Sequence, residues 1–121
     1  MAKILVIDDD ATHVELLKES LQSEGFAIIK GYDGDMAQEL ASAHAPNLII
    51  MDVNMPVCDG IEALHGLREC EGTSNIPVIF LTSVPSETLS PEIDFAAQVK
   101  CLKKPVDLAE LYSTVRYFLH D

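Results

Sequence analysis

The sequence predicts an α/β fold in which a parallel β-sheet is covered by helices on both faces. Short runs of consecutive apolar residues, typical of strands buried on both faces, recur along the chain. Segments with apolar residues at helical spacing alternate with these runs. The clearest run, residues 48–51, leads directly into Asp52, and Pro56 then prevents its continuation. Asp52 is therefore expected at the end of a buried strand, the edge at which parallel sheets bind ligands.

Five segments are expected to form the strands of this sheet. They are rich in apolar residues, and polar or turn-forming residues follow them. The expected strands are residues 4–7, 26–30, 48–52, 77–81 and 99–103. Pro77 is compatible with the fourth of them because proline is tolerated as the first residue of a strand.

The first helix is expected to follow the first strand and to end at Gly25. Its N-terminal cap is either Asp10 or Thr12, because Thr12 and Glu15 have the spacing of a capping box. Gly25 is expected to adopt the left-handed conformation that commonly ends a helix.

Further apolar stripes predict helices in the rest of the chain. The stripes lie within residues 36–41, 61–67 and 108–119. Asp107 is the expected N-cap of the last helix. Between the last two strands, residues 91–97 are expected to form at most a short or irregular fourth helix, because Pro85 and Pro91 interrupt this part of the chain.

The length and composition predict a single domain over residues 1–121. Hydrophobic residues make up 48% of the chain, enough for a packed core. Lys and Arg number 8 against 20 Asp and Glu, which gives a net charge of −12. This charge argues against direct binding to nucleic acid, which needs a basic surface.

The sequence also predicts a cytoplasmic protein. No apolar run approaches the roughly 20 residues that span a membrane, and the first apolar run is too short for a signal peptide. The cysteines are odd in number, contain no CxxC and read as reduced thiols: Cys58, Cys70 and Cys101. The histidines lack metal-ligand spacing and are expected at the surface: His13, His44, His65 and His120.

Polar side chains lie at the carboxyl ends of the expected strands. They are Asp8, Asp9, Asp52, Thr82 and Lys104. Because the carboxyl ends of parallel strands meet at one edge of a doubly wound sheet, we expect these side chains to lie close together. Neighbouring carboxylates raise one another's pKa values unless positive charge neutralises them. Mg²⁺, which prefers hard oxygen ligands, would balance this charge together with Lys104.

Such a site suits phosphoryl transfer, which needs a nucleophile in line with the phosphorus and fixed positive charge on the phosphoryl oxygens. A carboxylate can be the nucleophile and form an acyl phosphate. Each residue also has an ordinary structural explanation. The acidic residues 8–10 could cap the first helix, an explanation that we prefer for Asp10. Thr82 could be a plain strand-end threonine, and Lys104 a loop residue.

Four motifs together resemble the receiver domain of two-component response regulators. They are Ile-Leu-Val-Ile-Asp8-Asp9, Asp52-Val-Asn-Met-Pro-Val-Cys-Asp-Gly60, Phe-Leu-Thr82-Ser83 and Lys103-Lys104-Pro105. The resemblance extends over the whole chain, and although each motif is weak alone, the set in this order and spacing is specific. It implies a flavodoxin-like fold with the strand order 2-1-3-4-5.

The resemblance also implies a role for each site residue. Asp52 would be the phosphoacceptor, and the metal would be Mg²⁺. Asp9 would be its principal ligand, Asp8 would act largely through water, and Asp52 and the backbone carbonyl of Asn54 would complete the metal site.

Thr82 would donate a hydrogen bond to the phosphoryl group, and Lys104 would pair with it. The phosphodonor would be a phosphohistidine on a sensor histidine kinase or a histidine phosphotransfer protein. The chain would then be a phosphoprotein that switches an output partner in two-component signalling, and not an enzyme in the ordinary sense.

Two features depart from the family pattern. Cys101 stands where the family usually has Tyr or Phe, three residues before the lysine, and Pro85 and Pro91 interrupt the expected fourth helix. Both departures fall on the surface that changes with phosphorylation in the family. Signal output through that surface is therefore expected to differ.

Two other functions fit parts of the sequence. Asp8, Asp10 and Thr12 match the DxDxT motif of haloacid-dehalogenase-type phosphatases, in which the first aspartate is the nucleophile. The later acidic pair and the cap domain of that family are not found. A receiver-like interaction module that binds its partner without phosphorylation is the second alternative, which the interrupted fourth helix favours and the intact carboxylate site opposes.

Overall fold

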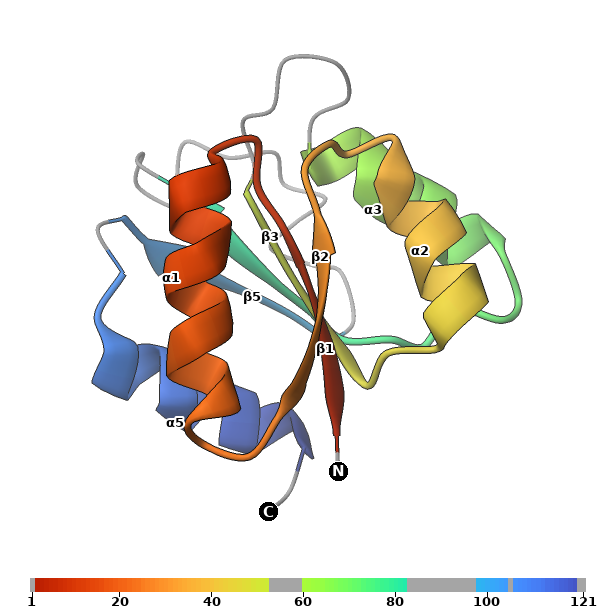
Figure 1. Ribbon diagram of the computed structural model, residues 1–121. Coiled ribbons are helices and arrows are strands. Elements are labelled where there is room, and N and C mark those ends of the chain that lie inside the picture. Colours follow the sequence, from red (N-terminus) through yellow and green to blue (C-terminus); the bar gives the residue numbers. More distant parts are fainter. Residues whose placement is uncertain (1, 53–59, 83–97, 105, 120–121) are drawn as a thin grey trace.

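The computed structural model describes residues 2–52, 60–82, 98–104 and 106–119 (Figure 1). Within these residues, five parallel strands form one sheet in the order β2-β1-β3-β4-β5, which confirms the flavodoxin-like order. The strands are β1 (Lys3–Ile7), β2 (Ala27–Gly31), β3 (Leu48–Asp52), β4 (Val78–Thr82) and β5 (Val99–Lys103). The second and fourth strands each begin one residue later than expected, and β3 has the expected bounds.

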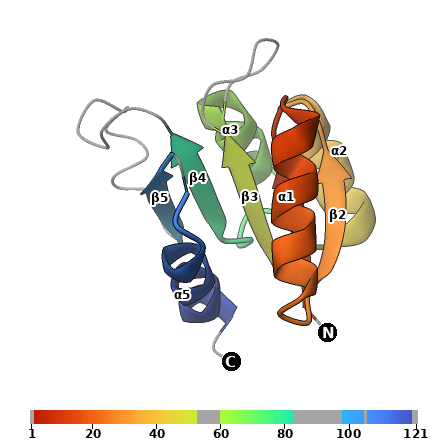
Figure 2. The ribbon, with the colours of Figure 1, turned by 60° about the vertical axis from the view of Figure 1, so that its left-hand side comes forward.

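Helices cover both faces of the sheet (Figures 1 and 2). On one face lie α1 (Ala11–Gln22) and α5 (Leu108–Leu119), and on the other lie α2 (Met36–His44) and α3 (Gly60–Glu69). The expected fourth helix, and with it Pro85 and Pro91, falls outside the described residues. In the described part of the chain, no helix is long and apolar enough to cross a membrane.

The sheet separates two apolar clusters. Every residue of β3 and β4 is buried, which explains their unbroken apolar runs. Alternate residues of each strand face opposite sides. Thus Ile50 packs with α1 and α5, whereas Ile49 and Met51 pack with α2 and α3. The two clusters hold the strands in register and so fix where their carboxyl ends lie.

Local capping sets the ends of the helices. Asp10, not Thr12, caps α1: its Oδ1 accepts the N–H groups of Thr12 at 3.0 Å and His13 at 3.4 Å. Gly25 has a φ of +95°. The positive φ is the feature that we expected of this glycine, and the N–H groups of Gly25 and Phe26 bond to the last turn of α1, at 3.0 and 3.2 Å, in a Schellman pattern.

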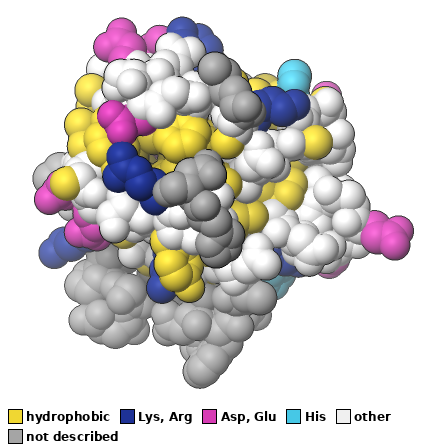
Figure 3. Space-filling model, turned by 90° about the horizontal axis from the view of Figure 1, so that it is seen from below, with side chains coloured by type: hydrophobic (Ala, Val, Ile, Leu, Met, Phe, Trp, Pro, Cys, Tyr) yellow, Lys and Arg dark blue, Asp and Glu magenta, His cyan; other side chains and the backbone are white. Residues whose placement is uncertain are grey.

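The last helix begins as expected, with Asp107 accepting the N–H of Ala109 at 2.9 Å. On the face viewed in Figure 3, which lies at the amino-terminal end of the strands, acidic and basic side chains are interspersed among apolar ones. The carboxylates singled out by the sequence lie at the opposite, carboxyl-terminal end of the sheet.

Candidate functional site at the carboxyl edge of the sheet

Three carboxylates come together where β1 and β3 end. These two strands are neighbours with Ile7 opposite Met51, so that Asp8 and Asp52 follow side by side. Asp8 is 1% exposed and Asp52 is 6% exposed, whereas Asp9 lies at the surface. Carboxylate oxygens of the three residues lie within 4.8 Å of one another. The structure thus brings together the acidic residues that the sequence singled out.

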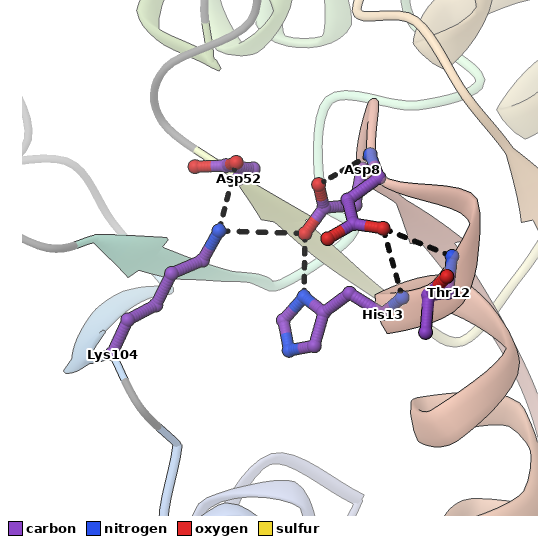
Figure 4. Close-up of polar contacts among 6 residues, drawn as sticks. Asp8, Thr12, His13, Asp52 and Lys104 are labelled. Carbon is purple, nitrogen blue, oxygen red and sulfur yellow. Dashed lines mark hydrogen bonds and ion pairs between the residues drawn. The ribbon is translucent and has the colours of Figure 1, made fainter.

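Lys104, just after β5, reaches this cluster from two strands away (Figure 4). Its Nζ lies 2.9 Å from Oδ2 of Asp52 and 3.5 Å from Oδ2 of Asp8. Its backbone N–H donates to the carbonyl of Thr82 at 2.7 Å, which ties the lysine to the end of β4. Burial lowers the pKa of Lys104, but the hydrogen bond to Asp52 and the charges of both aspartates outweigh it and raise that pKa. The lysine therefore supplies a fixed positive charge.

Asp8 is held by donors on both of its oxygens. Its Oδ1 accepts the backbone N–H of Asp10 at 3.0 Å, and its Oδ2 lies 2.6 Å from Nδ1 of His13. Burial alone would raise the pKa of Asp8, but these two hydrogen bonds and the charge of Lys104 bring it below its ordinary value. Asp8 is consequently a stable anion.

The pKa of Asp9 shifts in the opposite direction to that of Asp8. Desolvation and the adjacent negative charges of Asp8 and Asp52 raise the pKa of Asp9. A cation at this carboxylate would relieve that repulsion. Since Asp9 is exposed, a solvated ion can approach it without any rearrangement of the core.

The donor set fits a hard divalent cation. It consists of carboxylate oxygens, and the cluster lies next to solvent, so that an ion such as Mg²⁺ can keep several of its waters. Asn54, the expected source of a backbone ligand, lies outside the described residues. Thr82 is buried at the end of β4, next to the strand that carries Asp52.

His13 is the site residue that sequence reasoning missed. We expected it at the surface, and that expectation was wrong, because its side chain is 18% exposed and contacts Asp8. The residue is the third of α1, a position from which side chains reach back past the N-terminus of a helix. That position, next to an aspartate at a strand end, is the signal that could have revealed it.

Cys101 lies half-buried in β5, opposite Phe80 of β4. It packs against the cluster covered by α2 and α3. The small side chain that departs from the family pattern therefore occupies a position at the boundary of the core.

Comparison with known proteins identifies the family. The model of the response regulator receiver domain matches residues 4–116. The chain belongs to this family. Receiver domains are signalling domains of two-component systems and not conventional enzymes, as we expected from the four motifs.

Relatives with known names are response regulators. The chain is 38% identical over 122 residues to the transcriptional regulatory protein CpxR of Escherichia coli, an alignment that covers 98% of the chain and 50% of that protein. It is 25% identical over 118 residues to the polar-differentiation response regulator DivK of Brucella ovis, with 98% of the chain and 96% of DivK aligned. The chain thus spans about half the length of CpxR and nearly all of DivK.

Solved receiver structures superpose on the chain. The chemotaxis protein CheY4 of Vibrio cholerae matches with a TM-score of 0.90 at 29% identity, and covers 98% of both chains. A response regulator structure from Chloroflexus aurantiacus matches with a TM-score of 0.89 at 26% identity, over 99% of this chain and 98% of that one. The chain is therefore CheY-like in fold.

Proposed function

We propose that residues 1–121 form a receiver domain that accepts a phosphoryl group on Asp52 and thereby changes its binding to an output partner. The observation that carries the proposal is the contact of Lys104 with Asp52 inside a cluster of three carboxylates. A carboxylate at the end of a buried strand, paired with a lysine and beside further acidic ligands, has the parts that acyl-phosphate formation requires.

In the proposed reaction an oxygen of Asp52 attacks the phosphorus of a phosphohistidine. The new P–O bond forms as the P–N bond breaks, and the imidazole nitrogen of the donor leaves with the bonding electron pair. Lys104 stays beside Asp52 and stabilises the charge on the phosphoryl oxygens. Thr82, buried at the neighbouring strand end, would donate a hydrogen bond to the same group.

The carboxylates of Asp9 and Asp52, with Asp8 acting through water, would hold a Mg²⁺ ion, and the resemblance adds the backbone carbonyl of Asn54. When bound, Mg²⁺ would neutralise charge on the phosphoryl oxygens and help to orient them. The engagement of both Asp8 oxygens by Asp10 and His13 supports an indirect role for Asp8.

The proposed phosphodonor is a sensor histidine kinase or a histidine phosphotransfer protein in the cytoplasm, as for the receiver family in general. The output partner is a protein surface and not nucleic acid, because the chain carries a net charge of −12.

The test is incubation with acetyl phosphate, with and without Mg²⁺, followed by intact mass spectrometry. We expect one added phosphoryl group that requires the metal and is lost in Asp52→Asn. Asp35→Asn is the matched control, because Asp35 is exposed and its side chain makes no cap bond to α2.

Labelling that persists in Asp52→Asn at Asp8 would instead support the phosphatase-type alternative, which the two bonds to the Asp8 oxygens disfavour. Partner binding that is unchanged by phosphorylation would support the interaction-module alternative.

A further inference from the structure

His13 holds a buried carboxylate of the site. Its Nδ1 lies 2.6 Å from Oδ2 of Asp8, and because an ionised carboxylate can only accept, Nδ1 is the donor. The side chains of His13 and Asp8 are 18% and 2% exposed, so water competes little for this bond. The contact is short and largely buried, and it holds Oδ2 of Asp8 in place.

The same oxygen of Asp8 is also within reach of Lys104. His13 and Lys104 approach Oδ2 from different sides, at 2.6 and 3.5 Å, while Lys104 makes its shorter contact of 2.9 Å to Asp52 (Figure 4). The other oxygen of Asp8 accepts the N–H of Asp10. The β1–α1 connection and the first turn of α1 therefore each supply one donor to Asp8, and the lysine is the weaker partner of that carboxylate.

We infer that His13 is a positioning residue. Its hydrogen bond to Asp8 keeps the ammonium group of Lys104 in contact with Asp52. The inference rests on the proposed function, since it matters only if Asp52 is the phosphoacceptor. A lysine has a flexible stem and a compact charge, so it can move between two carboxylates on small torsional changes. A donor already bound to Asp8 lowers the gain that Lys104 would obtain by moving there.

The consequence is preorganisation of the positive charge. A lysine already at Asp52 stands where negative charge develops during phosphoryl transfer and need not be recruited during the reaction. Without the His13 hydrogen bond, Lys104 is expected to shift toward Asp8. The oxygens that would bind the metal are the same in both arrangements, so metal affinity should change little while the rate of transfer falls.

The experiment compares His13→Leu, which removes the donor, with His13→Asn, whose amide nitrogen can occupy nearly the same position as Nδ1. His44→Leu is the matched control, because His44 is the last residue of α2, at the opposite end of the strands. The measurements are Mg²⁺ affinity by calorimetry, the rate of phosphorylation by acetyl phosphate at saturating Mg²⁺, and crystal structures of the variants.

We expect His13→Leu to lower the saturated rate about tenfold, as for the loss of one hydrogen bond to a charged group. Its Mg²⁺ affinity should stay near that of the wild type, and Nζ of Lys104 should lie nearer to Asp8 than to Asp52. His13→Asn should restore most of the rate and the position of Lys104, and His44→Leu should match the wild type.

An unchanged rate in His13→Leu would overturn the inference, and so would a slow His13→Asn in which Lys104 still contacts Asp52. A parallel loss of Mg²⁺ affinity in His13→Leu would also overturn it, because His13 would then be shaping the metal ligands. If the wild type itself accepts no phosphoryl group, the proposed function fails, whereas the position of Lys104 in the crystal structures still decides whether His13 directs it.

Discussion

Replacement of Lys104 by methionine should both destabilise the protein and make it more dependent on Mg²⁺. The change keeps the unbranched stem of the side chain, one atom shorter, and removes a charge that lies 2.9 Å from Asp52 and 3.5 Å from Asp8. The three carboxylates of the cluster then face one another with no lysine between them. A bound divalent cation would take over the neutralising role.

The expected magnitude follows from how far these groups are buried. Removal of one partner from a buried ion pair costs about 3–5 kcal/mol, whereas an exposed pair contributes about 0–1 kcal/mol. The side chain of Lys104 is 27% exposed, and those of Asp52 and Asp8 are 9% and 2% exposed. We therefore expect a loss of about 2 kcal/mol without metal, or about 8 °C in melting temperature for a domain of this size.

The assay is thermal unfolding with and without Mg²⁺ for the wild type and for the variants Lys104→Met and Lys103→Met. Lys103 is the exposed neighbour in β5 and provides a control of the same chemistry. Mg²⁺ should raise the melting temperature of Lys104→Met more than that of the wild type. A Lys104→Met variant as stable as Lys103→Met, or one with a smaller response to Mg²⁺ than the wild type, would refute this account of the cluster.

Three further changes test other parts of the structure. Asp9→Asn should raise the melting temperature at neutral pH without metal and abolish most of the Mg²⁺ response, because the raised pKa of Asp9 means that its charged form is unfavourable in the folded protein. Gly31→Ala should cost about 1–3 kcal/mol of unfolding free energy by urea titration, since overpacked sites lose that much; its Cβ would meet Leu40 Cδ1 at 2.9 Å and also Cγ1 of the buried Ile7 at 3.1 Å. Asp8→Asn should weaken the dependence of stability on pH in acid. The lowered pKa of Asp8 contributes stability that is present above the ordinary aspartate pKa of about 3.9, and this stability is lost as the pH falls through the pKa of the folded state.

Each of these has an outcome that contradicts it. For Asp9, an Mg²⁺ response equal to that of the wild type would show that the metal lies elsewhere. For Gly31, the control is Gly72→Ala, whose Cβ would meet nothing within 4 Å, and equal stability of the two variants would remove the packing explanation. For Asp8, the free energy of unfolding is measured by urea titration at a series of acid pH values. If it falls as steeply with pH in Asp8→Asn as in the wild type, other carboxylates account for this dependence.

Much of the fold could be predicted because its signals are local. Buried strands need consecutive apolar residues, and β3 was predicted to the residue, ending at Asp52. Helix caps depend on residues within one turn, so that Asp107 and Gly25 are predictable from the sequence, and both make the hydrogen bonds of a helix end. The strand order came from the resemblance to a family and not from the pattern, because apolar runs do not specify which strand lies next to which.

The sequence by itself determined which chemical groups stand at the strand ends, because strand termini and residue types are both local properties. Only the tertiary structure decided how these groups share their contacts. Asp8 and Lys104 are 96 residues apart, and their separation of 3.5 Å depends on sheet order and on side-chain torsions that no local pattern encodes. The hydrogen bond from His13 to Asp8 is local, because it joins residues that are five apart. The opposite pKa shifts of the adjacent Asp8 and Asp9, by contrast, emerge only when distant elements bury these carboxylates and bring the charges of Lys104 and Asp52 beside them.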